Sequence, residues 1–279
     1  MVLKSYAKIN LSLSVNKKLK SGFHDIQSIY CLIDLNDKIL VKKIKNNHSD
    51  VISFSGPFSK HVNKSDNSIQ KILSLMRTNK LIKGYYSIKV QKKIPVFGGF
   101  GGGTSNAATL LKELTKKKID KKIFNKIINV IGSDLRLFST NHGFQKSLKS
   151  IIQLKKKHKF YFLLVFPMIN SSTKNVYSNI KKYSKSNNLQ KTNVDLKENF
   201  INYLKNSNND LQSIVEKQHP IIRQLLIKIS STKGCHFSRM TGSGSACFGL
   251  YTNKNCTKVA LKKLRKKYPK FWISTAKTI

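Results

Sequence analysis

Cysteine is scarce in this sequence, and long hydrophobic runs are missing. The four cysteines (Cys31, Cys235, Cys247 and Cys256) show no Cys-x-x-Cys spacing and have no histidine at zinc-finger distance. This argues against a disulfide framework or a structural zinc site, so we expect buried free thiols. The longest apolar run, residues 160–166, has seven residues, whereas a membrane-spanning helix needs about 20.

The first residues also lack the features of a secretory signal. Residues 1–8 contain no apolar stretch followed by a small-residue cleavage site. We therefore expect a cytoplasmic protein without a membrane segment. Hydrophobic residues make up 39% of the chain and include 15 Phe and 10 Tyr, which favours a packed globular protein over disorder.

Arginine is rare among the basic residues, although the formal net charge is +41. Nucleic-acid-binding proteins typically gather Arg on a basic stripe to contact bases and phosphates. Here lysines are spread along the whole chain beside many Asn and Ile, a pattern typical of A·T-rich coding sequence. We expect no nucleic-acid partner, although a basic RNA-binding protein stays as an alternative and the field attracts anionic ligands. Only five of the 53 basic residues are Arg: Arg77, Arg136, Arg223, Arg239 and Arg265.

Hydrophobic periodicity predicts a mixture of strands and helices. Apolar and polar residues alternate over 9–15, which predicts one half-buried strand with Lys8 and Asn10 on the same face. Taken alone, Lys8 would be read as part of a solvated strand face. Because strands and helices do not alternate strictly as βαβ units, the pattern indicates an α+β fold. Further strands are predicted at 38–43, 87–90 and 160–166 and near Phe237, Tyr251 and Trp272, helices at 68–76, 123–131, 221–229 and 256–267, and surface segments at 116–122 and 178–193.

A glycine-rich segment follows a strand that ends at Pro95 and leads into a helix. It holds five glycines and two hydroxyl residues between 98 and 105. Glycine permits positive φ and close backbone approach, so consecutive N–H groups can bind an anion at the start of the following helix. No Gly-Lys-Ser/Thr follows, and Thr104 takes the third glycine position of the dinucleotide-binding pattern. A flexible linker is the plain alternative.

Three further features are weak alone. The run Gly-Ser-Gly-Ser at 242–245 is compatible with either a tight turn or a second phosphate loop. Asp134, in Gly-Ser-Asp-Leu-Arg at 132–136, is one of 12 carboxylates and would suit a helix end. Lys8 is one of many lysines.

Together these segments resemble the GHMP kinase superfamily, and within it the family of 4-diphosphocytidyl-2-C-methyl-D-erythritol kinases. Four blocks occur in the family's order and span nearly the full length. They are Ala-Lys-Ile-Asn-Leu at 7–11, Gly-Phe-His-Asp-Ile-Gln-Ser at 22–28, the glycine segment with Gly-Ser-Asp at 132–134, and Ser-Arg-Met-Thr-Gly-Ser-Gly at 238–244. The glycine segment points to the superfamily, whereas Ala-Lys-Ile-Asn followed by Gly-Phe-His singles out this family.

The resemblance implies residue roles. Lys8 and Asp134 match the catalytic pair. The substrate-binding positions are Asn10, Phe23, His24 and, in a more divergent stretch, Tyr177, with Phe23 and Tyr177 enclosing the cytosine. The second glycine loop is Gly242, Ser243 and Gly244. The ATP-binding residues are Pro95, Val96, Phe97, Gly98, Gly99, Phe100, Gly101, Gly102, Gly103, Thr104 and Ser105.

The resemblance also implies an α+β two-domain GHMP-kinase-like fold, with an N-terminal ATP-binding domain (1–150), a C-terminal α/β domain (151–279) and the active site in the cleft between them. The expected reaction is ATP-dependent phosphorylation of the 2-hydroxyl of 4-diphosphocytidyl-2-C-methyl-D-erythritol in non-mevalonate isoprenoid biosynthesis, with Mg²⁺ as cofactor. No metal ligand and no oligomeric state is predicted. A GHMP kinase acting on homoserine, mevalonate or a sugar is the alternative. Phe97, Thr104 and Arg136 depart from the family pattern, where a small residue, Ser and Pro are usual.

Overall fold

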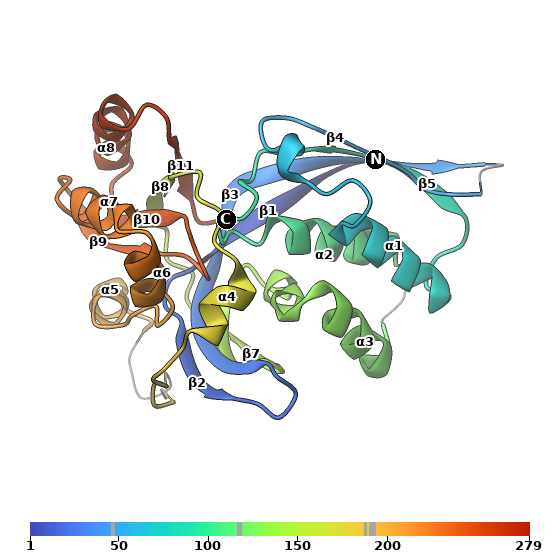
Figure 1. Ribbon diagram of the computed structural model, residues 1–279, viewed down its shortest axis with the longest axis horizontal. Helices are drawn as coiled ribbons and strands as arrows, with labels where there is room; N and C mark the ends of the chain where they lie inside the picture. Colours follow the sequence, from blue (N-terminus) through green and yellow to red (C-terminus); the bar gives the residue numbers. More distant parts are fainter. Residues whose placement is uncertain (46–47, 116–118, 187–188, 190–193) are drawn as a thin grey trace. The chain divides into compact units, whose positions relative to one another are not determined.

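The computed structural model describes residues 1–45, 48–115, 119–186, 189 and 194–279 (Figure 1). The chain forms two compact units, each assembled from separate segments. Unit 1 consists of Met1–Ala7, Leu35–Val96 and Gly101–Ser139, and unit 2 of Lys8–Asp34, Phe97–Phe100 and Thr140–Ile279. Strands β1 (Val2–Asn10) and β3 (His24–Ile44) each contribute residues to both units. The predicted domain division at 150/151 stays a prediction, because family domains and contact-based units need not share boundaries.

Unit 1 is a layer of strands with helices on one face. The second half of β3 pairs antiparallel with β5 (Tyr85–Gln91), from Lys38 opposite Gln91 to Ile44 opposite Tyr85, and β4 (Val51–Ser55) pairs parallel with β5. The apolar face of these strands packs on the helices drawn beside them in Figure 1, with Ile39 and Ile88 in the same buried cluster as Ile72 and Leu110. The helical elements are η1 (Ser59–His61), α1 (Ser68–Thr78), α2 (Gly102–Leu114), α3 (Lys121–Ile131) and η2 (Ser133–Ser139).

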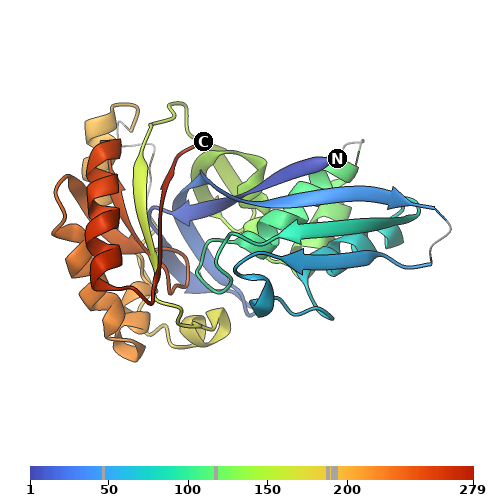
Figure 2. The same cartoon turned by 90° about the horizontal axis from the view of Figure 1, so that it is seen from above.

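Unit 2 contains an antiparallel sheet in the order β11-β8-β10-β9. Helices α7 (Ile221–Ser230) and α8 (Lys254–Lys267) cover one face of this sheet, and Figure 2 shows α8 running beside β8 and β11. Their apolar stripes bury Leu225 and Leu264 against Val165 and Ile273. The strands are β8 (Tyr161–Phe166), β9 (Cys235–Met240), β10 (Cys247–Tyr251) and β11 (Trp272–Lys277).

The remaining elements of unit 2 surround the first half of β3. Strand β2 (Ser14–Lys18) and strand β6 (His142–Ser147) both pair antiparallel with it, and β7 (Ser150–Gln153) pairs with β6. The other helices are α4 (Thr173–Ser178), α5 (Lys197–Lys205) and α6 (Gln212–Gln218).

The prediction of one half-buried strand over 9–15 is wrong. Strand β1 ends at Asn10 and β2 begins at Ser14, because the intervening backbone leaves the ladder for other partners. The N–H of Leu11 donates to Ile29 O at 2.7 Å, and the N–H of Leu13 donates to Asn208 O at 2.9 Å. Residues 8–13 are all buried, so no solvated face exists there. The reading of Lys8 as a solvated residue is therefore also wrong.

Most of the other predicted elements are present, with shifted ends. The helices predicted at 68–76, 123–131 and 221–229 are α1, α3 and α7, and the strand predicted at 160–166 is β8. All four cysteines are free thiols, but the expected burial holds only for Cys31 and Cys247, because Cys235 and Cys256 are partly exposed. Residues 116–118, 187–188 and 190–193 of the predicted surface segments lie outside the described residues. Within the described part of the chain, no helix combines the length and apolarity that crossing a membrane requires.

Candidate active site

A chain of buried polar groups ends strand β1. Lys8, only 3% exposed, donates from Nζ to Asn10 Oδ1, so the two side chains share a face as predicted. The Asn10 amide then donates from Nδ2 to Ser28 Oγ at 2.7 Å, and Ser28 Oγ donates to Ser12 O at 2.7 Å. Because both ends of the Asn10 amide are held, its orientation and that of the Lys8 ammonium are fixed.

The two glycine segments meet at this polar chain within unit 2. A Cβ at Gly242 would lie 3.1 Å from Gly99 O and 3.3 Å from Lys8 Nζ, and a Cβ at Gly99 would lie 2.3 Å from Thr241 O. Both glycines have positive φ, at +57° and +78°. Glycine is required at both positions, because a side chain at either would displace the neighbouring backbone. The Asn10 N–H donates to Thr241 Oγ1 at 3.0 Å, which ties the loop to β1.

The second glycine loop is fastened on its other side to the segment that precedes α4. Ser171 Oγ donates to Ser243 O at 3.1 Å, and the hydroxyls of Thr173 and Ser243 lie 2.8 Å apart. Ser245 Oγ donates to Ile169 O at 2.6 Å. This loop is therefore a fixed part of unit 2, and the loop and α4 share one support.

Arg239 supports the end of β1 through hydrogen bonds to backbone carbonyls. Its guanidinium is buried and donates to the carbonyls of Leu11, Leu204 and Ser207. Burial lowers the pKa of Arg239 to about 10, which leaves it charged at neutral pH. The residue appears in the sequence as part of the 238–244 block, but its contact with the residue after Asn10 is not visible there.

Aromatic rings gather around His24. The ring of Tyr177 lies 5.1 Å from that of His24 between centroids, and the ring of Tyr183 lies 6.4 Å away. Burial, followed by the nearby Lys18, lowers the pKa of His24 below its ordinary value, so the imidazole is neutral at pH 7. Phe23, the predicted second stacking residue, is 49% exposed. The structure brings His24 and Tyr177 together and adds Tyr183, for which no sequence motif exists.

In unit 1 the glycine segment leads into α2. Gly101 is the N-cap with φ +69°, and the Ser105 N–H donates to its carbonyl at 2.8 Å. The N–H groups of Gly102, Gly103 and Thr104 belong to the first turn, where a helix offers unpaired donors. Ser105 is buried and its hydroxyl donates to Tyr6 O at 2.6 Å and accepts from Ser5 Oγ at 2.7 Å. Its hydroxyl is thus used inside unit 1, and its expected ATP contact rests on the backbone.

A buried ion pair holds the strand that precedes the glycine segment. Lys92 Nζ donates to Asp37 Oδ2, and Asp37 Oδ1 accepts from the N–H groups of Lys93 at 2.7 Å and Ile94 at 2.9 Å. Both side chains are almost fully buried. The carboxylate therefore fixes the backbone immediately before Pro95, and sequence reasoning missed this role because the two residues are 55 positions apart.

Asp134 lies in unit 1 within the 3₁₀ helix η2, where it is partly exposed. Gly132, with φ +120°, ends α3 just before it. Arg136 stands where the family has proline. It packs over the Phe124 ring at 5.2 Å and donates to Asn125 Oδ1, so it binds η2 to α3.

Every second residue of the segment 97–101 has positive φ. The φ angles are +65° at Phe97, +78° at Gly99 and +69° at Gly101. Turns that contain left-handed residues can direct successive backbone N–H groups toward an anion, as in anion-binding nests. Nothing among the described residues groups three or more His, Cys, Asp or Glu side chains as a metal site would.

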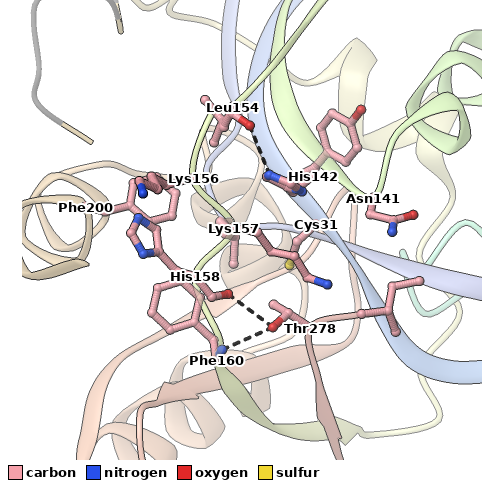
Figure 3. Close-up of a pocket in the computed structure, with 13 residues that line it drawn as sticks. Cys31, Asn141, His142, Leu154, Lys156, Lys157, His158, Phe160, Phe200 and Thr278 are labelled. Atoms are coloured by element: carbon pink, nitrogen blue, oxygen red, sulfur yellow. Dashed lines mark hydrogen bonds between the residues drawn. The ribbon is translucent and has the colours of Figure 1, made fainter. Parts of the chain in front are cut away.

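A separate small cavity lies in unit 2 away from these groups. Figure 3 shows His142 contacting Leu154 O through Nε2 at 3.1 Å, and the Thr278 hydroxyl between His158 O and the Phe160 N–H. The cavity encloses only about 20 Å³, room for about one water molecule. No residue of the predicted site lines it, so it has no place in the candidate active site.

Comparison with known proteins finds similarity over the whole chain. A 4-diphosphocytidyl-2-C-methyl-D-erythritol kinase of Pelagibacter ubique (strain HTCC1062) is 36% identical over 288 residues, which cover 99% of this chain and 98% of that protein. The crystal structure of a 4-(cytidine 5'-diphospho)-2C-methyl-D-erythritol kinase matches with a TM-score of 0.75 at 22% identity, covering 99% of each chain.

Two further matches concern the fold. The homoserine kinase from Cytophaga hutchinsonii ATCC 33406 matches with a TM-score of 0.63 at 15% identity, covering 100% of this chain and 94% of that one. The family model described as GHMP kinases C terminal matches residues 188–270. These likenesses confirm the fold that was expected from the sequence.

Proposed function

Because the chain belongs to the family of 4-diphosphocytidyl-2-C-methyl-D-erythritol kinases, we propose that it transfers the γ-phosphoryl group of ATP to the 2-hydroxyl of 4-diphosphocytidyl-2-C-methyl-D-erythritol. The chain is a small-molecule kinase. The product would serve the non-mevalonate route to isoprenoid precursors, and we propose that the reaction takes place in the cytoplasm.

The observation that carries this proposal is the meeting of both glycine segments at Lys8. In unit 2 the Lys8 ammonium and the Asn10 amide lie next to the backbones of two glycines, Gly99 and Gly242. Phosphoryl transfer requires mainly positioning and stabilisation of charge on the phosphoryl oxygens, and such a cluster supplies both. A linker or a tight turn between strands has no need of a buried lysine.

We propose that the N–H groups of residues 98–105 bind the ATP phosphates. The alternating left-handed residues and the free donors at the start of α2 support this role. The loop at 242–244, held in place by Asn209 Nδ2, which donates to Met240 O and Gly242 O at 2.8 Å each, would line the far side of the phosphoryl group.

We propose that Lys8 and Asp134 act on the hydroxyl group of the acceptor substrate. In this proposal Asp134 accepts or orients the hydroxyl proton, and Lys8 stabilises the charge that develops on the transferred group. General-base catalysis typically contributes about 10²–10⁴-fold, so Asp134→Asn should lower kcat by at least about 10²-fold while ATP binding persists. The matched control is Asp66→Asn, which removes an exposed carboxylate that pairs with Lys71 in a surface contact and should leave kcat unchanged.

Recognition of the cytidine moiety is proposed for the aromatic cluster of His24 and Tyr177, together with Phe23. Stacking needs a π face and no hydroxyl, so phenylalanine at position 23 is a suitable residue. Asn10, with its amide orientation fixed by Lys8 and Ser28, would contact the acceptor near the reacting hydroxyl.

The residues fit a magnesium ion only if the ion arrives with the nucleotide. Mg²⁺ commonly keeps several waters and binds through one or two carboxylates plus substrate phosphates. The described residues gather no cluster of carboxylates, and Asp134 is the carboxylate proposed for the site. When bound, the ion would neutralise charge on the β- and γ-phosphate oxygens.

The deciding experiment measures ADP formation with and without the cytidine acceptor, beside homoserine, mevalonate and a sugar panel. The proposal expects turnover only with the cytidine compound, and loss of that turnover in Asp134→Asn. If Asp134→Asn formed ADP at the wild-type rate with the cytidine acceptor, the proposed role of Asp134 would be wrong. Steeply salt-dependent RNA binding with no ATP turnover would favour the RNA-binding alternative instead.

A further inference from the structure

Phe97 is held in a backbone conformation that phenylalanine disfavours. Its φ is +65°, in a segment whose other left-handed positions, 99 and 101, are both glycine. The side chain is 50% exposed. Residues kept in such conformations cluster at functional sites, and the reasoning runs from the observed outlier to a role.

The surrounding backbone fixes where the ring is presented. Gly98 O accepts from the Ala246 N–H at 3.3 Å, and Phe100 O accepts from the Lys8 N–H at 3.0 Å. The Phe100 ring is buried and lies edge-on to Trp272, with centroids 6.2 Å apart. Phe97 therefore projects from an anchored backbone, and its position does not depend on a mobile loop.

The Phe97 ring is not part of an aromatic pair. Within the described part of the chain it makes no ring or cation contact, and half of it is exposed, in contrast to the buried Phe100 three residues later. Glycine would adopt the same φ without strain and would expose no apolar surface. A ring that is retained against both costs is expected to meet a ligand.

We propose that the Phe97 ring stacks on the purine base of the phosphoryl donor, so that donor affinity in this chain depends on the base as well as on the phosphates. The proposal rests on the proposed function, because it requires ATP in the glycine segment. The phosphates are proposed to meet backbone N–H groups of residues 98–105. Phe97 directly precedes these residues in the chain, so its exposed ring is the aromatic side chain adjacent to a nucleotide held by them.

The test compares nucleotide with inorganic tripolyphosphate, both with Mg²⁺, by titration calorimetry. Loss of base stacking typically weakens binding by about fivefold to 150-fold per base. We expect Phe97→Gly to weaken ADP and ATP binding about tenfold, the fold-change of about 1.4 kcal/mol, and to leave tripolyphosphate within about twofold. Phe97→Ala should lose the same affinity although its backbone stays strained, which separates the ring from the conformation.

Met168 is the matched control. It also has positive φ, at +62°, and is 47% exposed. Met168→Ala removes a similar exposed apolar side chain from a similar conformation, and it should change neither nucleotide nor tripolyphosphate affinity. Phe97→Trp keeps an aromatic ring and should bind ADP and ATP as tightly as the wild type. Because the chain has one native tryptophan, the fluorescence of the new Trp can be followed, and it should change on adding ADP but not on adding tripolyphosphate.

The binding measurements separate the stacking role of Phe97 from the proposed kinase function. Equal ADP affinity in wild type and Phe97→Gly overturns the stacking role, as does an equal loss of ADP and tripolyphosphate affinity. A selective loss of affinity for the cytidine acceptor would place the ring on the other substrate and also overturns it. If the wild type binds no ATP and has no kinase activity, the proposed function fails before the role of Phe97 arises.

Discussion

Asp37 offers the sharpest test of how the glycine segment is held. Its carboxylate accepts from Lys92 Nζ and from two backbone N–H groups directly before Pro95, and it is 0% exposed. Asp37→Ala would leave a buried ammonium without a counter-ion and two donors without an acceptor. Breaking one side of a buried pair typically costs about 3–5 kcal/mol, and each unsatisfied buried donor about 1–3 kcal/mol.

The expected loss for Asp37→Ala is therefore at least about 5 kcal/mol, comparable with the total stability of many domains. Milder variants keep the experiment measurable. Asp37→Asn retains an acceptor for the N–H groups of Lys93 and Ile94 but removes the negative charge, and Lys92→Met removes the positive charge. Each should destabilise unit 1 by about 3 kcal/mol, because each leaves one uncompensated buried charge.

The double variant decides whether the pair acts as proposed. Asp37→Asn with Lys92→Met removes both charges and should lose clearly less than the sum of the single variants, a coupling of more than about 1 kcal/mol. Urea unfolding followed by circular dichroism gives the free energies, and hydrogen exchange of α2 amides reports unit 1 separately. The exposed pair of Lys71 and Asp66, 2.8 Å apart with side chains 42% and 62% exposed, is the control, and its removal should cost below about 1 kcal/mol. Single variants at Asp37 and Lys92 that matched this surface control would refute the reasoning.

Four further changes follow from the geometry. Arg239→Lys cannot reach three carbonyls from one ammonium and should cost about 2–4 kcal/mol in thermal unfolding; an unchanged Tm would contradict the bracing role. Gly242→Ala would press on Gly99 O and Lys8 Nζ, so kcat should drop more than about tenfold in steady-state assays while the protein stays folded. Phe23→Ala should raise KM for the acceptor and spare KM for ATP, whereas equal changes would indicate a folding defect. Acceptor KM should rise when the pH is lowered through the depressed pKa of His24, and a flat profile would argue against a role for the neutral ring.

The sequence predicts elements and local loops well and long-range contacts poorly. The helices α1, α3 and α7 follow from spacing of apolar residues alone, because each buries one stripe. The strand predicted over 9–15 fails because its alternation is local, whereas Leu13 takes its hydrogen bonds from residues 208–210. Periodicity carries no information about a partner that is almost 200 positions away.

The candidate site shows the same division. The glycine segment is recognisable because its chemistry lies in consecutive residues, and Lys8 with Asn10 because two positions on a strand share a face. Ser28, Tyr183 and Asp37 were missed, since each acts through a contact that only the fold creates. Ser105 stays a predicted ATP-binding residue, and the structure adds that its hydroxyl donates to the carbonyl of Tyr6, a contact that the sequence does not reveal.

The scarcity of carboxylates also explains how this basic chain is held together. With 12 acidic residues for 53 basic ones, most cations cannot pair with an acid. Arg239, a buried cation, is satisfied by carbonyl oxygens, and Asp210 and Asp34 also accept from the backbone N–H groups of Val15 and Lys277. Burying a charged group is costly, yet Lys8 is only 3% exposed. Its place beside the glycine loop therefore supports the proposed phosphate site more strongly than the net charge does.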